Sequence, residues 1–262
     1  MDITKDYLIR YYSQQSDDEQ RMYKADRTRT YAQYLRLREI ADFAARHLPF
    51  SPAARVLDLG CGDGYATEHA LGRQPCSVCI GLDLSFSKLR VMRGRIERCH
   101  TIAADAECVP LKSASFDMVF CFELLEHVLD PLSLLVEIGR LLRRDGRCLI
   151  SAPADSIMQP AVISTLSRLK YLNGRKKRFN EHLHFTSIAR MRPMLAEARL
   201  TMVAHKLVGF QYPLRSVVAA RARSGKLVSL ERRISGILRF GSFGIGPLTF
   251  GNEYLLLCVR PR

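Results

Sequence analysis

A glycine-rich turn next to an aspartate is the part of the sequence with the clearest potential for chemistry. The stretch VLDLGCGDG places glycines at Gly60, Gly62 and Gly64, and Asp58 stands two residues before the first of them. Glycines in such a turn let the backbone approach a ligand closely, and a following helix offers unpaired N–H groups. Dinucleotide sites use the spacing GxGxxG, with the helix aimed at a pyrophosphate. The GxGxG spacing and the carboxylate favour instead a ligand that carries a positive charge and no phosphate.

Two further acidic residues follow the next two predicted strands. Asp83 ends the strand GLDL, where a carboxylate can accept hydrogen bonds from both hydroxyls of a ribose. NAD enzymes share that placement, so Asp83 indicates an adenosine but not the rest of the ligand. Asp105 directly follows the third strand. Acidic residues after three strands in order are a more specific signal than the glycines alone.

These residues are positioned by short apolar runs that alternate with amphipathic stretches. The pattern predicts strands over residues 55–59, 78–84, 101–104, 116–122, 147–152, 201–210 and 252–259, and helices over residues 31–48, 65–71, 85–98, 132–142 and 187–198. Such alternation favours a mostly parallel sheet that is covered on both faces. Ser85 and Thr186 are expected to cap helices, and Asp145-Gly146 to form a turn before a strand.

The charge of the chain is strongly segregated. Residues 151–262 carry 19 Lys/Arg against 5 Asp/Glu, which accounts for the whole formal net charge of +14. This asymmetry suggests an anionic partner, and a solvated basic face is the alternative. No apolar run reaches the roughly 18 residues that span a bilayer. The N-terminus lacks the basic start and apolar core of a signal peptide, so the protein is expected to be cytoplasmic.

The eight cysteines are expected to be thiols. Cys79, Cys121, Cys148 and Cys258 fall within predicted strands, where cysteine acts as a small buried apolar residue. Cys76 and Cys79 form a lone CxxC with no second pair at metal spacing, so no metal site is expected.

Several motifs in series resemble one enzyme family. VLDLGCGDG, GLDLS, ADAECVPLKSASFDMVF, ELLEHVLDP and LLRRDGRCLISAP resemble the class I S-adenosylmethionine-dependent methyltransferases, especially the branch with quinone-biosynthesis and other small-molecule enzymes. The resemblance covers about residues 56–210 and resumes at residues 252–259. It implies an α/β, doubly wound, Rossmann-like and mostly parallel seven-stranded sheet with helices on both faces and an antiparallel last strand. It implies S-adenosylmethionine as the cofactor.

The resemblance also implies roles for individual residues. The glycine loop would wrap the methionine end of the cofactor, with Asp58 fixing the turn and helping to place the amino group. Asp83 would take the ribose hydroxyls, Asp105 the adenine amino group, and Phe122 and Glu123 would line the sulfonium side. The implied cofactor-binding set is Asp58, Gly60, Cys61, Gly62, Gly64, Asp83, Leu84, Asp105, Ala106 and Phe122.

Three side chains are candidates for moving a proton from the methyl acceptor, which a hydroxyl, acidic carbon or amine acceptor can require. His182 and His184 lie in the motif EHLHFT, and Glu123 lies near the expected methyl position. The alternative for either histidine is that it caps or pins a loop. His127, in the Glu-His pair after the fourth strand, is expected to organise that loop.

The chain is expected to comprise a helical extension, residues 1–48, and a catalytic domain, residues 49–262. The extension would lie over the cofactor as a lid or pack on the sheet. Insertions at residues 153–185 and 211–251 would cap the acceptor site, and substrate specificity lies in such insertions rather than in the fold. Both insertions carry apolar stripes beside basic residues. They suggest peripheral contact with an anionic membrane, with solvated charges as the alternative.

The expected function is methyl transfer to a small-molecule acceptor that is lipid-like, anionic or both. A nucleic-acid methyltransferase is the first alternative. It is disfavoured because no RNA-binding module is appended, and FELLE stands after the fourth strand in place of an NPPY-type signature. A non-catalytic cofactor-binding protein is the second alternative, disfavoured by the intact glycine loop and its three acidic companions.

Overall fold

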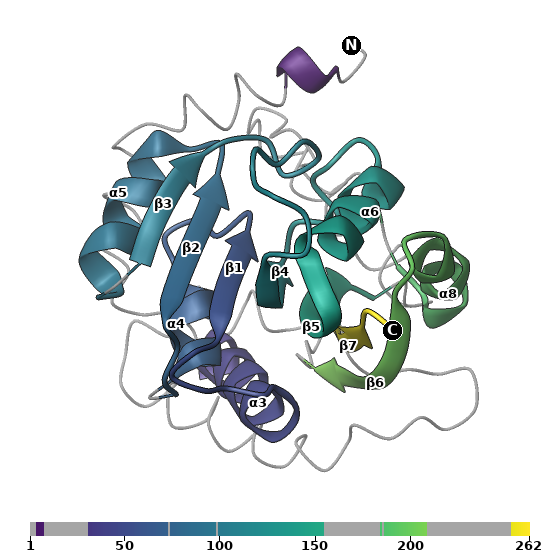
Figure 1. Cartoon of the computed structure of the whole chain (residues 1–262), viewed down its shortest axis with the longest axis horizontal. Coiled ribbons are helices and arrows are strands. Elements are labelled where there is room, and N and C mark those ends of the chain that lie inside the picture. The colour runs from purple at the N-terminus through teal and green to yellow at the C-terminus, as the bar shows by residue number, and fades with distance from the viewer. Residues whose placement is uncertain are drawn as a thin grey trace, which may run out of the picture.

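Within the described part of the chain, seven strands form one mixed sheet (Figure 1). The computed structural model describes residues 4–7, 31–72, 74–97, 99–154, 184, 186–208 and 253–262, and only the backbone of residues 31–35. The strands are β1 Arg55–Leu59, β2 Val78–Asp83, β3 Cys99–Ala103, β4 Phe116–Phe122, β5 Leu142–Pro153, β6 Thr201–Val208 and β7 Glu253–Val259. Their order across the sheet is β3-β2-β1-β4-β5-β7-β6.

The strands β1 to β5 run parallel, and β7 is antiparallel to both of its neighbours, β5 and β6. The expected seven-stranded sheet with an antiparallel last strand is therefore confirmed. The registers place Leu59 of β1 beside Leu82 of β2 and Cys121 of β4. The carboxyl ends of these strands thus meet at one edge, which is where open α/β sheets bind ligands.

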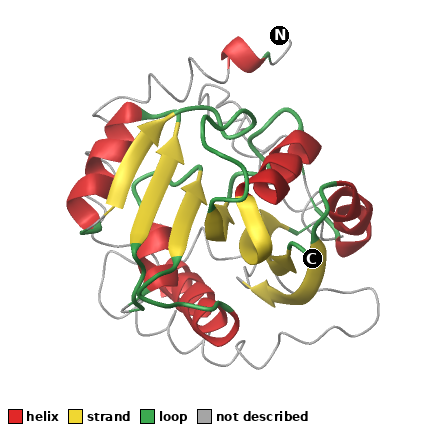
Figure 2. Ribbon diagram, in the orientation of Figure 1, coloured by secondary structure: helices red, strands yellow, loops and turns green. Residues whose placement is uncertain are grey.

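Helices cover both faces of the sheet, as predicted (Figure 2). The helices α3 Tyr31–His47, α4 Tyr65–Leu71 and α5 Phe86–Arg95 pack on one face, and α6 Pro131–Leu141 and α8 Ile188–Glu197 on the other. Val56 is buried on the face covered by α3, α4 and α5, and Leu57 on the face covered by α6 and α8, because successive side chains of a strand point to opposite faces. No helix in the described ranges is both long and apolar enough to cross a membrane.

Helix caps agree with the sequence in one place and differ in another. Ser85 caps α5 as expected, because its hydroxyl accepts a hydrogen bond from Lys88 N. The prediction for Thr186 is wrong, because Ser187 caps α8 by accepting from Arg190 N. Thr186 instead donates its backbone N–H to Pro153 O and bridges Ala154. Because Thr186 and Ser187 are adjacent hydroxyl residues, either could cap the helix by sequence alone. The pairing of Thr186 with the chain just after β5 leaves Ser187 as the cap.

The turn predicted at Asp145-Gly146 lies inside a strand. β5 begins at Leu142, and its pairing with β4 shifts so that Phe116 faces Leu142 whereas Met118 faces Arg147. The extra residues bulge from the ladder, with Asp145 at a φ of 61°. Asp145 N donates to Arg260 O, so the end of β7 supports the bulge. Local sequence predicted the change of direction but not the neighbour that holds it within the sheet.

The other element boundaries differ modestly from the predicted ones. α5 ends at Arg95 because Ile96 is already extended, and β3 begins two residues early at Cys99. Residues 209, 210 and 252, predicted as strand, lie outside the described residues. The four cysteines predicted within strands are there, and all four are buried. Complete burial raises the pKa of the Cys121 thiol well above its usual range, so this side chain is a neutral apolar group.

Candidate cofactor and active site

The residues predicted to bind a cofactor gather at the carboxyl edge of the parallel strands. The glycine loop follows β1, Asp83 ends β2, Asp105 follows β3 and Phe122 ends β4. In Figure 1 the arrowheads of β1, β2 and β3 point the same way, toward this edge. Parallel pairing therefore brings together residues that the sequence spreads over more than sixty positions.

The glycine loop has a conformation that requires glycine. Gly60 and Gly64 have φ values of 67° and 77°, a region that other residues rarely adopt. A Cβ at Gly60 would also lie 2.7 Å from Leu124 Cδ1, and one at Gly64 would lie 2.6 Å from Met92 Cγ. A Cβ at Gly62 would meet no atom within 4 Å. Gly62 thus borders open space, whereas the glycines on either side of it are tightly packed.

Asp83 joins the loop to the next helix. Its Oδ2 accepts a hydrogen bond from Gly62 N at 2.9 Å, and its Oδ1 accepts one from Ser85 N at 2.7 Å. The backbone N–H groups of Gly60 and Cys61 both donate to Leu82 O, which fixes the loop against the end of β2. Each carboxylate oxygen has a second lone pair. Asp83 can therefore still accept hydrogen bonds from a ligand hydroxyl.

Asp58 is a buried acidic side chain with an oxygen that can still accept a hydrogen bond. Its side chain is 1% exposed, and the Thr67 hydroxyl donates to its Oδ2. Its Oδ1 is buried and has no hydrogen-bond partner among the described residues. Burial raises the pKa of Asp58 to about 7, a rise that the Thr67 hydrogen bond opposes and the negative charge of Asp83 increases. A cationic ligand group near Oδ1 would offset the cost of this burial.

The N-terminal extension contacts the Asp105 end of the edge. Asp105 Oδ1 accepts from Glu107 N at 2.9 Å, and Lys5 Nζ lies 2.9 Å from Asp105 Oδ2 and 3.2 Å from Glu107 Oε2. The hydrogen bond to Asp105 raises the pKa of Lys5. Ala106, the next predicted binding residue, is buried. Sequence reasoning missed Lys5, because a single lysine one hundred residues from its partner carries no local signal.

An arginine clamp, made of Arg36 with Glu123 and Glu253, borders the other end of the edge. Arg36 Nη1 lies 3.0 Å from Glu123 Oε1, while Nε and Nη2 both donate to the Glu253 carboxylate. Glu123 has a φ of 49° and donates its backbone N–H to Ser151 Oγ at 3.0 Å. Glu123 was predicted at this place; Arg36 and Glu253 were not, because they come from opposite ends of the chain.

Glu126 adds a second buried acid beside the arginine clamp. It is 2% exposed, and its Oε2 has no hydrogen-bond partner among the described residues. Burial, with smaller contributions from the negative charges of Glu123 and Glu253, raises the pKa of Glu126 to about 8. Glu126 is therefore held largely as a neutral acid at pH 7, with an O–H to donate.

Of the two candidate histidines, His184 lies within the described residues and His182 does not. His184 Nε2 lies 3.0 Å from Val128 O and must donate its proton there, because a carbonyl oxygen only accepts. The ring thus ties its own segment to the loop after β4, and in the neutral form only Nδ1 can accept a proton. His182 lies outside the described residues. His127 donates its backbone N–H to Leu124 O within the same loop.

Taken together, the edge can hold a polar, positively charged adenosine compound. Carboxylates lie at or just beyond the carboxyl ends of three neighbouring strands, β1, β2 and β3. One of them has a buried oxygen with no hydrogen-bond partner among the described residues, and open space lies over Gly62. In the described ranges, no group of three or more His, Cys, Asp or Glu side chains is arranged to hold a metal ion.

Comparison with known proteins agrees with this geometry. The profile of a family described as "Methyltransferase domain" matches residues 57–150. A ubiquinone biosynthesis O-methyltransferase of Xylella fastidiosa (strain 9a5c) is 36% identical over 115 residues, which cover 42% of this chain and 46% of that protein. Another, from Xanthomonas campestris pv. campestris (strain B100), is 32% identical over 103 residues, 38% of this chain and 43% of that protein. The chain therefore spans less than half the length of these curated relatives.

Solved structures show the same fold. A chain in the complex between the Haloferax volcanii Trm112 methyltransferase activator and a methyltransferase has a TM-score of 0.64 at 19% identity, covering 96% of this chain and 98% of that one. Geranyl diphosphate C-methyltransferase from Streptomyces coelicolor A3(2), solved with Mg²⁺, geranyl diphosphate and S-adenosyl-L-homocysteine, has a TM-score of 0.57 at 17% identity. That match covers 84% of this chain and 78% of that one. At such identities the likeness concerns the fold alone.

Proposed function

We propose that the protein is a class I S-adenosylmethionine-dependent methyltransferase that methylates a small molecule. The match of residues 57–150 to the methyltransferase-domain family supports this proposal. The observation that carries the proposal is the row of carboxylates Asp58, Asp83 and Asp105 at the ends of consecutive strands. The buried Oδ1 of Asp58 has no hydrogen-bond partner among the described residues, so it can accept a hydrogen bond from a ligand ammonium group.

The residues present fit this cofactor along its length. Asp58 would hold the ammonium group, and Asp83 would accept hydrogen bonds from the ribose hydroxyls. Asp105 would accept from the adenine amino group, with Ala106 beside the ring. The open space over Gly62 would admit the methionine end. When bound, S-adenosylmethionine supplies an electrophilic methyl group on a sulfonium, so the protein mainly has to orient the acceptor.

The arginine clamp is suited to orienting the acceptor. Arg36 pairs with both Glu123 and Glu253, which fixes the Glu123 carboxylate as a hydrogen-bond acceptor. The remaining candidates for proton removal are the two histidines. We infer that His182 is the better candidate, because His184 already donates to Val128 O and acts as a tie.

The proposed acceptor is a hydroxyl group on a lipid-like molecule. Support comes from the relatives that carry the name ubiquinone biosynthesis O-methyltransferase, although the match covers less than half of each. The insertions at residues 153–185 and 211–251, which would contact such an acceptor and an anionic membrane, lie almost entirely outside the described residues. From the basic sequence of these insertions alone, we propose that the protein is cytoplasmic and makes peripheral contact with an anionic membrane. Neutralising residues 175–178 would weaken that contact.

Calorimetry with S-adenosylmethionine and S-adenosylhomocysteine tests the proposed cofactor site. Asp83→Ala should lower affinity at least tenfold, because two charge-assisted hydrogen bonds of about 1.5–3 kcal/mol each are lost. Asp83 also holds Gly62 and Ser85 in place, so Asp83→Asn, which keeps one oxygen, guards against a folding artefact. Asp42→Ala, an aspartate on the exposed side of α3, is the matched control. If wild-type protein binds neither compound, or folded Asp83→Asn binds as wild type does, the proposal fails.

Methyl transfer itself is tested with S-adenosylmethionine that is labelled on the methyl group. The label should move to a hydroxylated aromatic compound with an apolar side chain, and not to the same compound with its hydroxyl groups already methylated. Binding of the cofactor without transfer to any hydroxyl compound would favour the non-catalytic alternative.

A further inference from the structure

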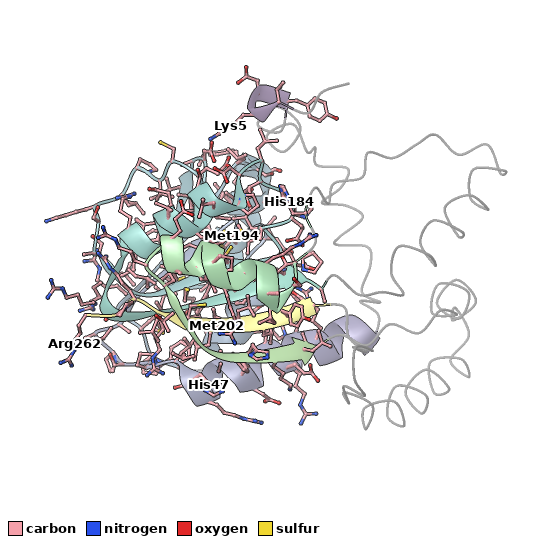
Figure 3. The ribbon with its side chains drawn as sticks, turned by 90° about the vertical axis from the view of Figure 1, so that its right-hand side faces the viewer. Lys5, His47, His184, Met194, Met202 and Arg262 are labelled. Carbon is pink, nitrogen blue, oxygen red and sulfur yellow. The ribbon has the colours of Figure 1, made fainter. Side chains whose placement is uncertain are left out.

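An open cavity of about 610 Å³ lies at the amino edge of the sheet, opposite the cofactor site. It is formed by the bulge of β5, the turn from α8 into β6, and the residues after β7. Because β7 is antiparallel to β5, its end reaches the edge at which β5 and β6 begin. Figure 3 shows Arg262, at this edge, well separated from Lys5, which marks the adenine end of the cofactor site.

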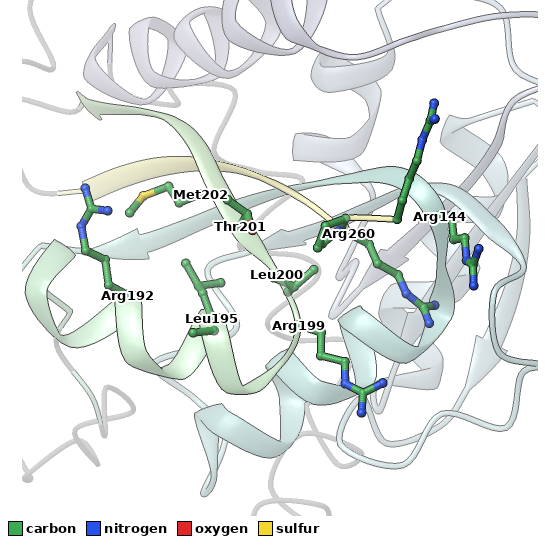
Figure 4. A pocket seen from close by; sticks show the side chains of 11 residues that line it. Arg144, Arg192, Leu195, Arg199, Leu200, Thr201, Met202 and Arg260 are labelled. Carbon is green, nitrogen blue, oxygen red and sulfur yellow. The ribbon is translucent and has the colours of Figure 1, made fainter.

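Five arginines line this cavity: Arg144, Arg192, Arg199, Arg260 and Arg262. In Figure 4, Arg192 lies on one side of Leu195 and Leu200, and Arg144 and Arg260 lie on the other. Leu195 and Leu200 are buried and form an apolar floor. Four of the five arginines belong to the basic segment, residues 151–262, so the cavity concentrates part of the charge excess of the whole chain.

Most of these charges have no compensating carboxylate in the part of the chain that the structure describes. Arg262 pairs with Asp145 at 3.0 Å, and Arg260 donates to the backbone carbonyls of Arg140 and Leu142. For Arg144, Arg192 and Arg199, no ion pair with any described residue exists. Like charges around one concavity repel each other, and an apolar floor strengthens their field.

The end of α8 holds Arg199 at the cavity. Arg199 follows the C-cap of α8 with a φ of 55°, and hydrogen bonds from Arg199 N to Ala196 O and from Leu200 N to Leu195 O close the helix in a Schellman motif. Glycine or asparagine is usual at this position, where this chain has a cation.

We propose that this arginine cavity binds a phosphate group, as a second site distinct from the cofactor site. Guanidinium groups match phosphate oxygens in pairs, and several arginines around one concavity can engage all of them. An apolar floor would favour a phosphate attached to an apolar body. The phosphate could come from an anionic lipid headgroup or from a soluble phosphorylated compound. The proposal does not rest on methyl transfer.

The test measures binding of inorganic pyrophosphate by calorimetry at constant ionic strength. The double variant Arg144→Gln/Arg199→Gln removes two unpaired charges from the cavity. The control Lys88→Gln/Arg90→Gln removes two positive charges from α5, at the other end of the sheet. Wild type and control should bind with similar affinity, and the cavity variant at least tenfold more weakly. Equal binding by all three proteins, or no binding by wild type, would overturn the proposal.

Two further measurements separate folding and ligand source from binding. Without anion, the cavity variant should melt no lower than wild type, because like-charge repulsion has been relieved. Its affinity for S-adenosylmethionine should be unchanged.

Vesicles of phosphatidylglycerol and of phosphatidylcholine identify the source of the phosphate group. Binding to the first alone, lost in the cavity variant and displaced by pyrophosphate, assigns a lipid headgroup; pyrophosphate binding with no such vesicle binding assigns a soluble phosphorylated ligand.

Discussion

Arg36 in α3 and Glu253 at the start of β7 form a two-point ion pair although 217 residues separate them in the chain. The same guanidinium reaches Glu123 at the end of β4. One arginine thereby ties the helix that precedes the sheet to the edge where the acceptor is proposed to bind. Burial raises the pKa of Glu253, and the charge of Arg36 opposes that rise.

Replacing Arg36 should destabilise the protein strongly. Arg36→Met leaves Glu253 buried without its partner, and breaking a buried pair in this way costs about 3–5 kcal/mol. Chemical denaturation measures the loss. Arg38→Met is the control, because Arg38 is exposed on the same helix and its pair with Asp42 is long, at 3.9 Å. Arg36→Met/Glu253→Gln should recover much of the loss. A loss below about 1 kcal/mol in Arg36→Met would show that the pair is not buried in solution.

Glu126 should make stability fall with rising pH. Its folded pKa of about 8 lies above the ordinary value of 4.5, so its stabilising contribution is complete below pH 4.5 and is lost as pH rises toward 8. Glu126→Gln cannot ionise, so its free energy of unfolding should rise relative to that of wild type across that window, by on the order of 5 kcal/mol at pH 9. Denaturation at pH 5, 7 and 9 without cofactor tests this. Parallel pH profiles for the two proteins would contradict the buried position of Glu126.

His184 should act through its hydrogen bond to Val128 O and not as a base. His184→Gln places an amide N–H near the position of Nε2 and should keep turnover within about threefold, whereas His184→Ala should lose about 1 kcal/mol of stability. His182→Ala should lower turnover about 10²–10⁴-fold with cofactor affinity unchanged. Turnover with a cofactor titration for each variant separates the roles. A hundredfold loss in stable His184→Gln would make His184 the base.

Lys5 should compete with adenine for Asp105. Asp105 Oδ1 accepts from Glu107 N and Oδ2 pairs with Lys5, so an adenine amino group would share an oxygen with one of these partners and would approach beside the Lys5 charge. Because an exposed ion pair is worth up to about 1 kcal/mol, Lys5→Met should tighten S-adenosylmethionine binding by up to about fivefold. Calorimetry measures the change, with Lys88→Met as the control. Weaker binding in Lys5→Met would instead mean that Lys5 closes over bound cofactor.

The sequence by itself determined the order of the strands and helices, the glycine loop, and the carboxylates after the first three strands. These features are local: apolar spacing sets the elements, and glycine spacing sets the turn. Parallel pairing then follows from the alternation, so the sequence is enough to place Asp58, Asp83 and Asp105 at one edge. Local ambiguity explains the two errors, at Thr186 and at the Asp145 bulge.

Only the tertiary structure decided which distant groups share a buried or concave space. The arginine clamp, the neutral state of Glu126, the contact of Lys5 with Asp105 and the arginine cavity each join segments from different parts of the chain. Composition showed an excess of positive charge but not where it would collect. Burial and charge proximity depend on how the elements pack, and no spacing along the sequence encodes the low dielectric that makes an unpaired oxygen or an uncompensated guanidinium significant.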